Sequence, residues 1–210
     1  MNKRLFIILF LLCSFTSAHA QTAGSYYVAA RGMYSAPIGS LGDWFKPATG
    51  VQIAFGTRSE SDLTWEFNAE MMTYSKPNTG KLYYPDLDLK LELFGLGAQV
   101  DYAITTQSMV TPYVTAGAAF YRWLGTRGRH ALDSAQTQIV WELKQNDWSA
   151  GFNAGIGVNV AVTSALSIDA SARYHIVNGE LWPALALRLE NVSGFQSLRT
   201  SVGLKYEFEF

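Results

Sequence analysis

Cysteine, histidine and charge are scarce in this chain of 210 residues: it has one cysteine and three histidines, and only 16% of its residues are charged. A single cysteine excludes a disulfide-stabilised scaffold. The 16 basic and 17 acidic residues leave a net charge of −1, which excludes both the basic surface of a nucleic-acid-binding protein and the charge excess of a disordered chain. Hydrophobic residues (49%), aromatic residues (14%) and glycine are abundant instead.

The first twenty residues have the pattern of a secretory signal peptide. Lys3 and Arg4 supply the positive start, residues 5–15 form an apolar run, and Ala18 and Ala20 make the small-x-small motif that precedes cleavage. The apolar run is about eleven residues long, too short for the roughly twenty that a membrane-spanning helix needs. We therefore expect Sec export and cleavage after Ala20, with residues 21–210 as the mature domain.

Cleavage would remove the cysteine, Cys13, and leave a net charge of −3. A lipoprotein acylated at Cys13 is the alternative, but Leu12 stands where such a site needs a small residue. Export without a disulfide is typical of a bacterial envelope protein. No later segment has about eighteen apolar residues without a charge, so a membrane protein with this sequence must cross as a closed β-barrel, which also satisfies its backbone in lipid.

Apolar and polar residues alternate with period two along most of the remaining chain, which predicts strands and not helices. In the last segment Val202, Leu204 and Tyr206 share an apolar face, and Arg199 and Lys205 lie on the opposite face. The same alternation predicts eight strands, over residues 26–35, 50–57, 63–74, 94–102, 112–122, 148–162, 166–176 and 197–210.

Two stretches leave the phase of the alternation open. Residues 87–93 alternate in the phase opposite to residues 94–102. This indicates either a β-bulge near Leu93 and Phe94 or a stretch that lies beyond the bilayer. In residues 112–122 both faces contain apolar side chains, so the sequence does not decide which of them faces lipid.

The connectors between the predicted strands alternate in length. Short turns on the periplasmic side and long loops outside are typical of an outer-membrane barrel, and an even strand count places both termini in the periplasm. About 24 residues per strand and connector fit eight strands, whereas sixteen strands would leave about 12. The short links lie near residues 59–62, 105–110 and 163–165, and the long ones at 37–49, 76–87, 124–147 and 177–196.

An eight-stranded barrel is just wide enough inside for its own side chains. The face opposite the apolar one carries charges of both signs, and we expect them to pair inside the barrel and close it. A soluble exported β-barrel with these charges outside is the alternative; the aromatic chain end and the glycines opposite apolar residues favour the membrane version. The predicted lumen charges are Arg31, Glu66, Glu70, Asp101, Asp169, Arg173, Lys205 and Glu207.

Lipid A-modifying enzymes use barrels of this size, so the histidines need a separate test. The deacylase type needs a histidine and a serine two residues apart on a strand, but apolar residues follow both His130 and His175. We therefore expect no catalytic residues, and expect His175 to pack near the extracellular rim. Two histidines distant in sequence predict no metal site, and no motif predicts a cofactor.

Any role beyond a structural one is expected in the long loops. Residues 138–144 are interpreted as short strands that extend a hairpin above the membrane, and Trp123 is expected at the membrane interface together with Trp141. Residues 181–195 are apolar enough to cover the barrel mouth or bind an apolar ligand. The loop interaction candidates are Arg127, Arg129 and Trp141, with the two arginines near lipopolysaccharide phosphates.

The closing sequence YEFEF resembles the C-terminal signature by which the barrel-assembly machinery recognises outer-membrane barrels, with Tyr206, Phe208 and Phe210 as its aromatic residues. Residues 111–121 and 152–174 are similar to the fifth strand and to the sixth and seventh strands of the small OmpA/OmpX-like outer membrane protein β-barrel family. The resemblance implies an all-β fold: an eight-stranded antiparallel up-and-down transmembrane barrel, without the peptidoglycan-binding domain of full-length OmpA-type proteins.

This family includes adhesins, structural anchors and small-solute channels, so the resemblance implies a fold more than a function. We expect a structural or adhesion-type role; a narrow channel for small or hydrophobic solutes is the alternative, and a lipid A-modifying enzyme is less favoured. The implied partners are outer-membrane lipids and lipopolysaccharide, with the assembly machinery and periplasmic chaperones during biogenesis. The implied location is the outer membrane of a Gram-negative-type bacterium.

Overall fold

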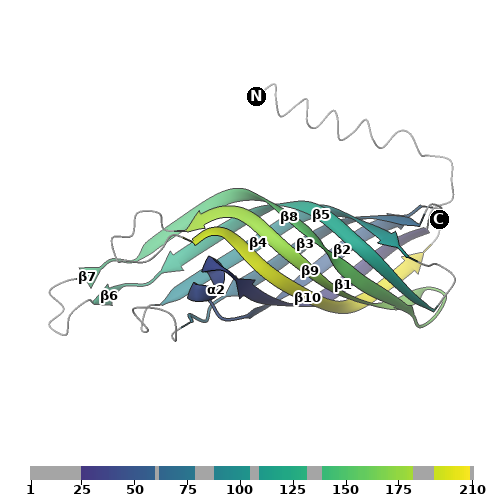
Figure 1. Cartoon of the computed structure of the whole chain (residues 1–210), viewed down its shortest axis with the longest axis horizontal. Helices are drawn as coiled ribbons and strands as arrows, with labels where there is room; N and C mark the ends of the chain where they lie inside the picture. Colours follow the sequence, from purple (N-terminus) through teal and green to yellow (C-terminus); the bar gives the residue numbers. More distant parts are fainter. Residues whose placement is uncertain are drawn as a thin grey trace, which may run out of the picture.

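Eight long strands close into one antiparallel barrel in the order β1-β10-β9-β8-β5-β4-β3-β2 (Figure 1). The computed structural model describes residues 25–59, 62–78, 88–104, 109–131, 139–181 and 192–208. Each long strand pairs with the next long strand along the chain, so the predicted eight-stranded up-and-down barrel is confirmed. The strands are β1 (Ser25–Ile38), β2 (Ala48–Arg58), β3 (Leu63–Tyr74), β4 (Leu89–Ala103), β5 (Val110–Arg127), β8 (Leu143–Ala161), β9 (Leu166–Leu181) and β10 (Val192–Phe208).

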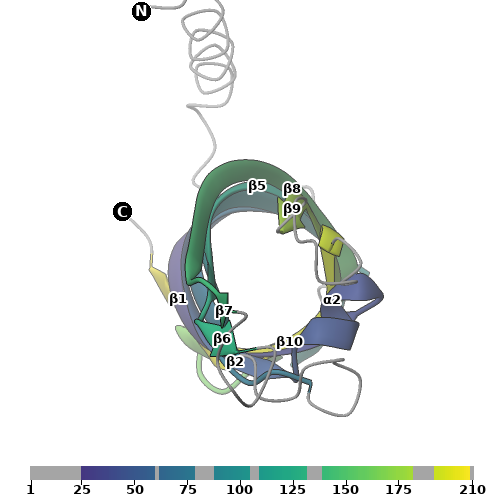
Figure 2. The same cartoon turned by 90° about the vertical axis from the view of Figure 1, so that its left-hand side faces the viewer.

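The two ends of the barrel differ. At one end lie the first residues of β1 and the last residues of β10, where Tyr26 pairs with Phe208 (Figure 1). At the other end, which faces the viewer in Figure 2, β6 (His130–Ala131) pairs with β7 (Ile139–Val140) and extends the β5–β8 hairpin beyond the barrel. Since termini and short turns are periplasmic in outer-membrane barrels, the hairpin end is extracellular.

A short helix, α2 (Ser40–Trp44), joins β1 to β2 near the extracellular end (Figure 2). The following residues are tied to the segment after β3: the backbone NH of Lys46 donates to the carbonyl of Lys76 at 2.8 Å, and that of Asn78 donates to the carbonyl of Trp44 at 2.8 Å. Among the described residues, no helix has the length and hydropathy of a membrane span.

The outer surface is apolar, as lipid requires. The residues of β5 that alternate outward are Val114, Ala116, Ala118 and Phe120, which resolves the phase that the sequence left open. Large hydrophobic side chains elsewhere on the wall are also exposed, whereas charges such as Arg31, Glu66 and Asp169 face inward. This arrangement is the inverse of a soluble barrel, and it confirms the membrane version of the fold.

Of the two alternatives for residues 87–93, the β-bulge near Leu93 and Phe94 is wrong. Strand β4 pairs with β3 and β5 in an unbroken register through these residues. Leu89, Leu91 and Leu93 are at most 2% exposed and face the interior, while Phe94 is 43% exposed and faces outward. The phase of the strand is therefore constant, and what changes toward the extracellular end is the chemistry of the interior, from polar to apolar.

Large side chains that face the interior pack directly over glycines of the neighbouring strands. A Cβ atom added at Gly157 would lie 2.2 Å from the ring of Tyr113, and one added at Gly56 would lie 2.3 Å from the ring of Tyr27. No real side chain fits at such distances. Glycine at these positions therefore gives each tyrosine ring the space to lie against the wall.

Alanine at Gly157 is expected to lower the free energy of unfolding by about 1–3 kcal/mol, since overpacking forces the ring of Tyr113 to move. Denaturant titration of the refolded barrel in micelles would measure the change. The matched control is Gly32→Ala on β1, where the nearest atom to an added Cβ is a carbonyl oxygen at 3.9 Å. Equal stabilities for the two variants would contradict the steric role of Gly157.

Candidate functional site

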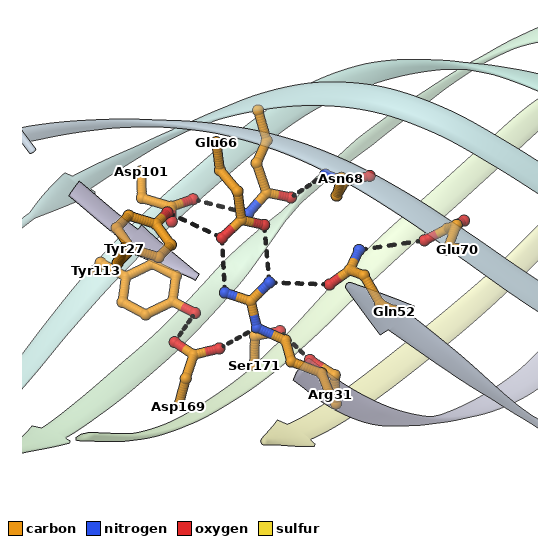
Figure 3. Close-up of polar contacts among 12 residues, drawn as sticks. Tyr27, Arg31, Gln52, Glu66, Asn68, Glu70, Asp101, Tyr113, Asp169 and Ser171 are labelled. Atoms are coloured by element: carbon orange, nitrogen blue, oxygen red, sulfur yellow. Dashed lines mark hydrogen bonds and ion pairs between the residues drawn. The ribbon is translucent and has the colours of Figure 1, made fainter. Parts of the chain in front are cut away.

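An arginine on β1 is at the centre of a polar network inside the barrel (Figure 3). The two terminal nitrogens of Arg31 donate to the two carboxylate oxygens of Glu66 at 2.8 and 2.7 Å, and Nε donates to Asp169 at 2.7 Å. The hydroxyl of Tyr27 donates to Glu66 at 2.9 Å, and that of Tyr113 donates to Asp169 at 2.8 Å. The buried guanidinium thus has two anionic partners, each held by a tyrosine.

A second ion pair lies closer to the extracellular end. Arg199 of β10 pairs with Glu70 of β3. The hydroxyl of Tyr121 donates to Glu70 at 2.7 Å, and the guanidinium of Arg199 lies 5.7 Å from the centre of the Tyr121 ring. Nδ1 of His175 lies 3.5 Å from the same hydroxyl, and His175 is 2% exposed. The histidine is therefore enclosed by this cluster inside the barrel.

A glutamine joins the two clusters. Oε1 of Gln52 accepts from Arg31 at 3.0 Å, and Nε2 of Gln52 donates to Glu70 at 3.3 Å (Figure 3). The same Oε1 also accepts from Arg173 at 3.2 Å. Arg173 also donates to Gln99 at 2.6 Å. Among the described residues, Arg173 has amide partners and no carboxylate within ion-pair distance, so its charge is balanced by the network as a whole.

Charged and aromatic side chains also fill the interior toward the periplasmic end. The ammonium of Lys205 lies 3.6 Å from the centre of the Tyr27 ring, and Asp101 accepts from the side chain of Gln99 at 3.2 Å. A cavity of about 20 Å³ lies between Asp101, Asp169 and Lys205. That space holds about one water molecule.

Among the described residues, the interior holds five buried basic and four buried acidic side chains. Of the eight predicted lumen charges, seven are at most 9% exposed, and Glu207 is half-buried near the chain end. Arg199 was missing from that set although it lies on the same face of its strand as Lys205, so the alternation could have found it. The buried charges are Arg31, Arg127, Arg173, Arg199 and Lys205, with Glu66, Glu70, Asp101 and Asp169.

An apolar layer covers this network on the extracellular side. Trp123 was expected at the membrane interface, but it is 1% exposed and faces the interior, where its Nε1 donates to Ser149 at 2.9 Å. Its ring meets that of Phe195 edge to face at 5.4 Å. This layer was not predicted from the sequence, because the type of an apolar residue does not show whether it faces the interior or the lipid. The layer consists of Met33, Leu41, Trp44, Phe45, Ala48, Met72, Tyr74, Leu89, Leu91, Leu93, Ala119, Tyr121, Trp123, Val177 and Phe195.

The three loop candidates separate in the structure. Arg127 is a residue of β5 and not of a loop; it is 4% exposed, faces inward and donates to the carbonyl of Trp141 at 3.0 Å. Its expected contact with lipid phosphates is therefore wrong. Arg129 and Trp141 do lie outside the barrel, and the guanidinium of Arg129 is 5.3 Å from the centre of the Trp141 ring.

Some predictions fall on residues that the structure does not describe. These are the signal peptide (1–20), most of the apolar segment 181–195, and Phe210 of the assembly signature. Two of the signature's aromatic residues are described: the ring of Tyr206 lies 6.4 Å from that of Phe208, which in turn is 6.3 Å from Tyr26. These rings lie along the β1–β10 pairing that closes the barrel.

A closed eight-stranded barrel with an apolar outer wall and a paired, charged interior defines an outer-membrane β-barrel protein. Residues 6–208 match the family model described as outer membrane protein beta-barrel domain, and the chain belongs to that family. Its location is accordingly the outer membrane of a Gram-negative-type bacterium.

Solved structures with the same fold support this assignment. The chain is similar to Neisserial surface protein A (22% identity, TM-score 0.58, 88% of this chain and 99% of that chain covered). It is similar to the attachment invasion locus protein Ail of Yersinia pestis (12% identity, TM-score 0.53, 89% of this chain and 100% of that chain covered). It is also similar to OprG of Pseudomonas aeruginosa (14% identity, TM-score 0.54, 90% of this chain and 97% of that chain covered). At these identities the likeness concerns the fold. None of the curated proteins compared matches the chain.

Proposed function

We propose that this protein is a closed surface barrel that acts through its extracellular β5–β8 hairpin, in an adhesion-type role, and not by transport or catalysis. The observation that carries the proposal is the hairpin itself. It extends past the barrel, is tied by the β6–β7 pair, and presents Trp141, which is 69% exposed beside Arg129. Tryptophan and arginine are enriched among the residues that dominate binding energy at protein interfaces.

Two further observations support a non-catalytic, non-conducting barrel. His175 faces Ser197 across the β9–β10 pairing, but both are at most 2% exposed inside the barrel, where an acyl chain from the membrane does not reach them. The ion pairs of Arg31 and Arg199 cross the interior. Among proteins of the same fold, one is titled an attachment invasion locus protein and another a surface protein.

The hairpin can be removed without cutting the barrel. Arg127 pairs with Leu143 in the last row of β5 and β8. Replacing residues 128–142 by Asn-Gly would close these strands with a two-residue turn that such hairpins favour. A non-adherent laboratory bacterium that displays the full barrel is expected to bind cultured epithelial monolayers. Bacteria that display the variant with the short turn are expected to bind no better than bacteria without the protein.

Surface labelling must show equal display of both forms, and unboiled gels must show that both are folded. Equal adherence of the two forms would contradict the role of the hairpin. The alternative function, a narrow channel, is tested separately by recordings in planar bilayers. We expect no stable conductance from the full barrel; a stable, large conductance would contradict the closed interior.

A further inference from the structure

One basic residue of β5 faces the membrane and not the interior. Arg122 lies between Tyr121 and Trp123, which are 2% and 1% exposed inside the barrel, and the alternation places Arg122 on the outer wall, where it is exposed. Next to it on the same face is Phe120, which is 68% exposed. Arg122 therefore interrupts the apolar, outward-facing residues along this strand, between Phe120 and the partly exposed Leu124.

The position of Arg122 along the strand places it near the outer boundary of the bilayer. With a rise of about 3.3 Å per residue and a strand tilt of about 40°, the segment from Val110 to Arg122 spans about 30 Å along the membrane normal, compared with an apolar band of about 25 Å. An arginine on the lipid face costs about 2–4 kcal/mol at the midplane but little near the boundary. Arg122 thus lies at the level of the outer-leaflet headgroups.

The neighbours of Arg122 are those of a headgroup site. In the strand register it lies between Phe94 of β4 and Trp148 of β8, which are 43% and 60% exposed on the outer wall. Aromatic residues gather at this level of membrane barrels. Among the residues that the structure describes, Arg122 has a long hydrogen bond to Asn146, at 3.4 Å, and no carboxylate within ion-pair distance.

The other basic residues nearby on this wall are already paired. Lys90 contacts Glu92 at 2.8 Å, and Lys144 contacts Glu142 at 2.8 Å. Arg122 is the basic side chain of this group whose guanidinium is left for an external anion.

We propose that Arg122 binds a phosphate of a phosphorylated lipid headgroup in the outer leaflet, with Phe94 and Trp148 packed against the upper part of the acyl chains. A guanidinium presents two parallel NH donors that match a phosphate, which an ammonium does not. The contact expected of the buried Arg127 is thereby assigned to a residue on the outer wall. The site lies below the hairpin and is independent of its proposed adhesive role.

Native mass spectrometry of the refolded barrel in micelles tests the proposal, with phosphorylated lipid A and dephosphorylated lipid A as competing probes. One basic residue near an anionic surface contributes about 1 kcal/mol, so we expect a preference of about five-fold for the phosphorylated form. Arg122→Gln should abolish the preference, Arg122→Lys should retain part of it, and Lys144→Gln, the matched control, should retain all of it.

The proposal would be overturned if Arg122→Gln kept the full preference for phosphorylated lipid A. It would also be overturned if the unmodified protein showed no such preference. An equal loss in Lys144→Gln would overturn it too, because it would indicate an effect of net charge. Equal displacement of both lipids by inorganic phosphate would likewise overturn a headgroup site. Unboiled gel mobility checks that each variant is folded, and if Arg122→Gln does not fold, an unchanged preference in Arg122→Lys gives the contradicting result.

Discussion

Replacement of Arg31 by methionine is expected to lower the free energy of unfolding by about 3–5 kcal/mol, because removal of one partner leaves buried charges uncompensated. Glu66 and Asp169 would keep their tyrosine donors but lose the guanidinium that contacts both of them at 2.7–2.8 Å. Denaturant titration of the refolded protein, followed by tryptophan fluorescence, would measure the change. The effect is large because all three side chains are inside the barrel, where water cannot replace the lost contacts.

A matched surface pair provides the control for this experiment. Lys90 and Glu92 are 2.8 Å apart but remain 45% and 41% exposed. Lys90→Met should therefore change the stability by less than about 1 kcal/mol. Adding Glu66→Gln and Asp169→Asn to Arg31→Met should recover part of the lost stability, since these two carboxylates then no longer carry uncompensated charge. If Arg31→Met and Lys90→Met are equally stable, the buried network does not stabilise the barrel.

Truncation of Trp123 to alanine is expected to cost a similar amount, about 3–5 kcal/mol, as large-to-small changes in well-packed cores do. The ring is 1% exposed, packs edge to face on Phe195, and donates to Ser149 at 2.9 Å. Its removal would leave a cavity in the apolar layer and a buried hydroxyl without its donor. The same titration applies, and a shift of the midpoint with an unchanged slope would report stability alone.

Trp141 is the natural comparison, since it has the same side chain in an exposed position. It is 69% exposed and contacts Arg129 through its ring face. Trp141→Ala should change the stability by less than about 1 kcal/mol, the magnitude of an exposed cation–π contact. A small effect for Trp123→Ala would show that the apolar layer is loosely packed and would restore an interfacial position for this residue.

The alternation of residue types was enough to assign most faces of the wall. In the predicted strand 50–57 the alternation places Val51, Ile53 and Phe55 on one face, and all three are at least 46% exposed. The outward phase of β1, β3 and β10 followed in the same way. A strand with one face in lipid and the other in a crowded interior has no freedom to slip by one residue, because slipping would exchange both faces.

The strand ends and the loop boundaries were harder to predict from the sequence. The connector expected at residues 124–147 begins four positions later in the structure, after Arg127, and ends before Leu143. Above the membrane the outer face no longer needs apolar residues, so the alternation weakens although the hydrogen-bonded ladder continues. For this reason Arg127 was interpreted as a loop residue. Arg122 received no role because the phase of residues 112–122 was left open.

The sequence by itself determined the class of this protein: export, eight strands, an apolar wall, a charged interior and the termini at the periplasmic end. Each of these depends on local composition and a two-residue period. Only the tertiary structure decided which charges meet, such as Arg31 with Asp169 at a separation of 138 residues, and that the interior becomes apolar toward the outside. Barrel closure brings distant strands together through their register, and a period of two residues carries no information about which strands will face each other across the interior.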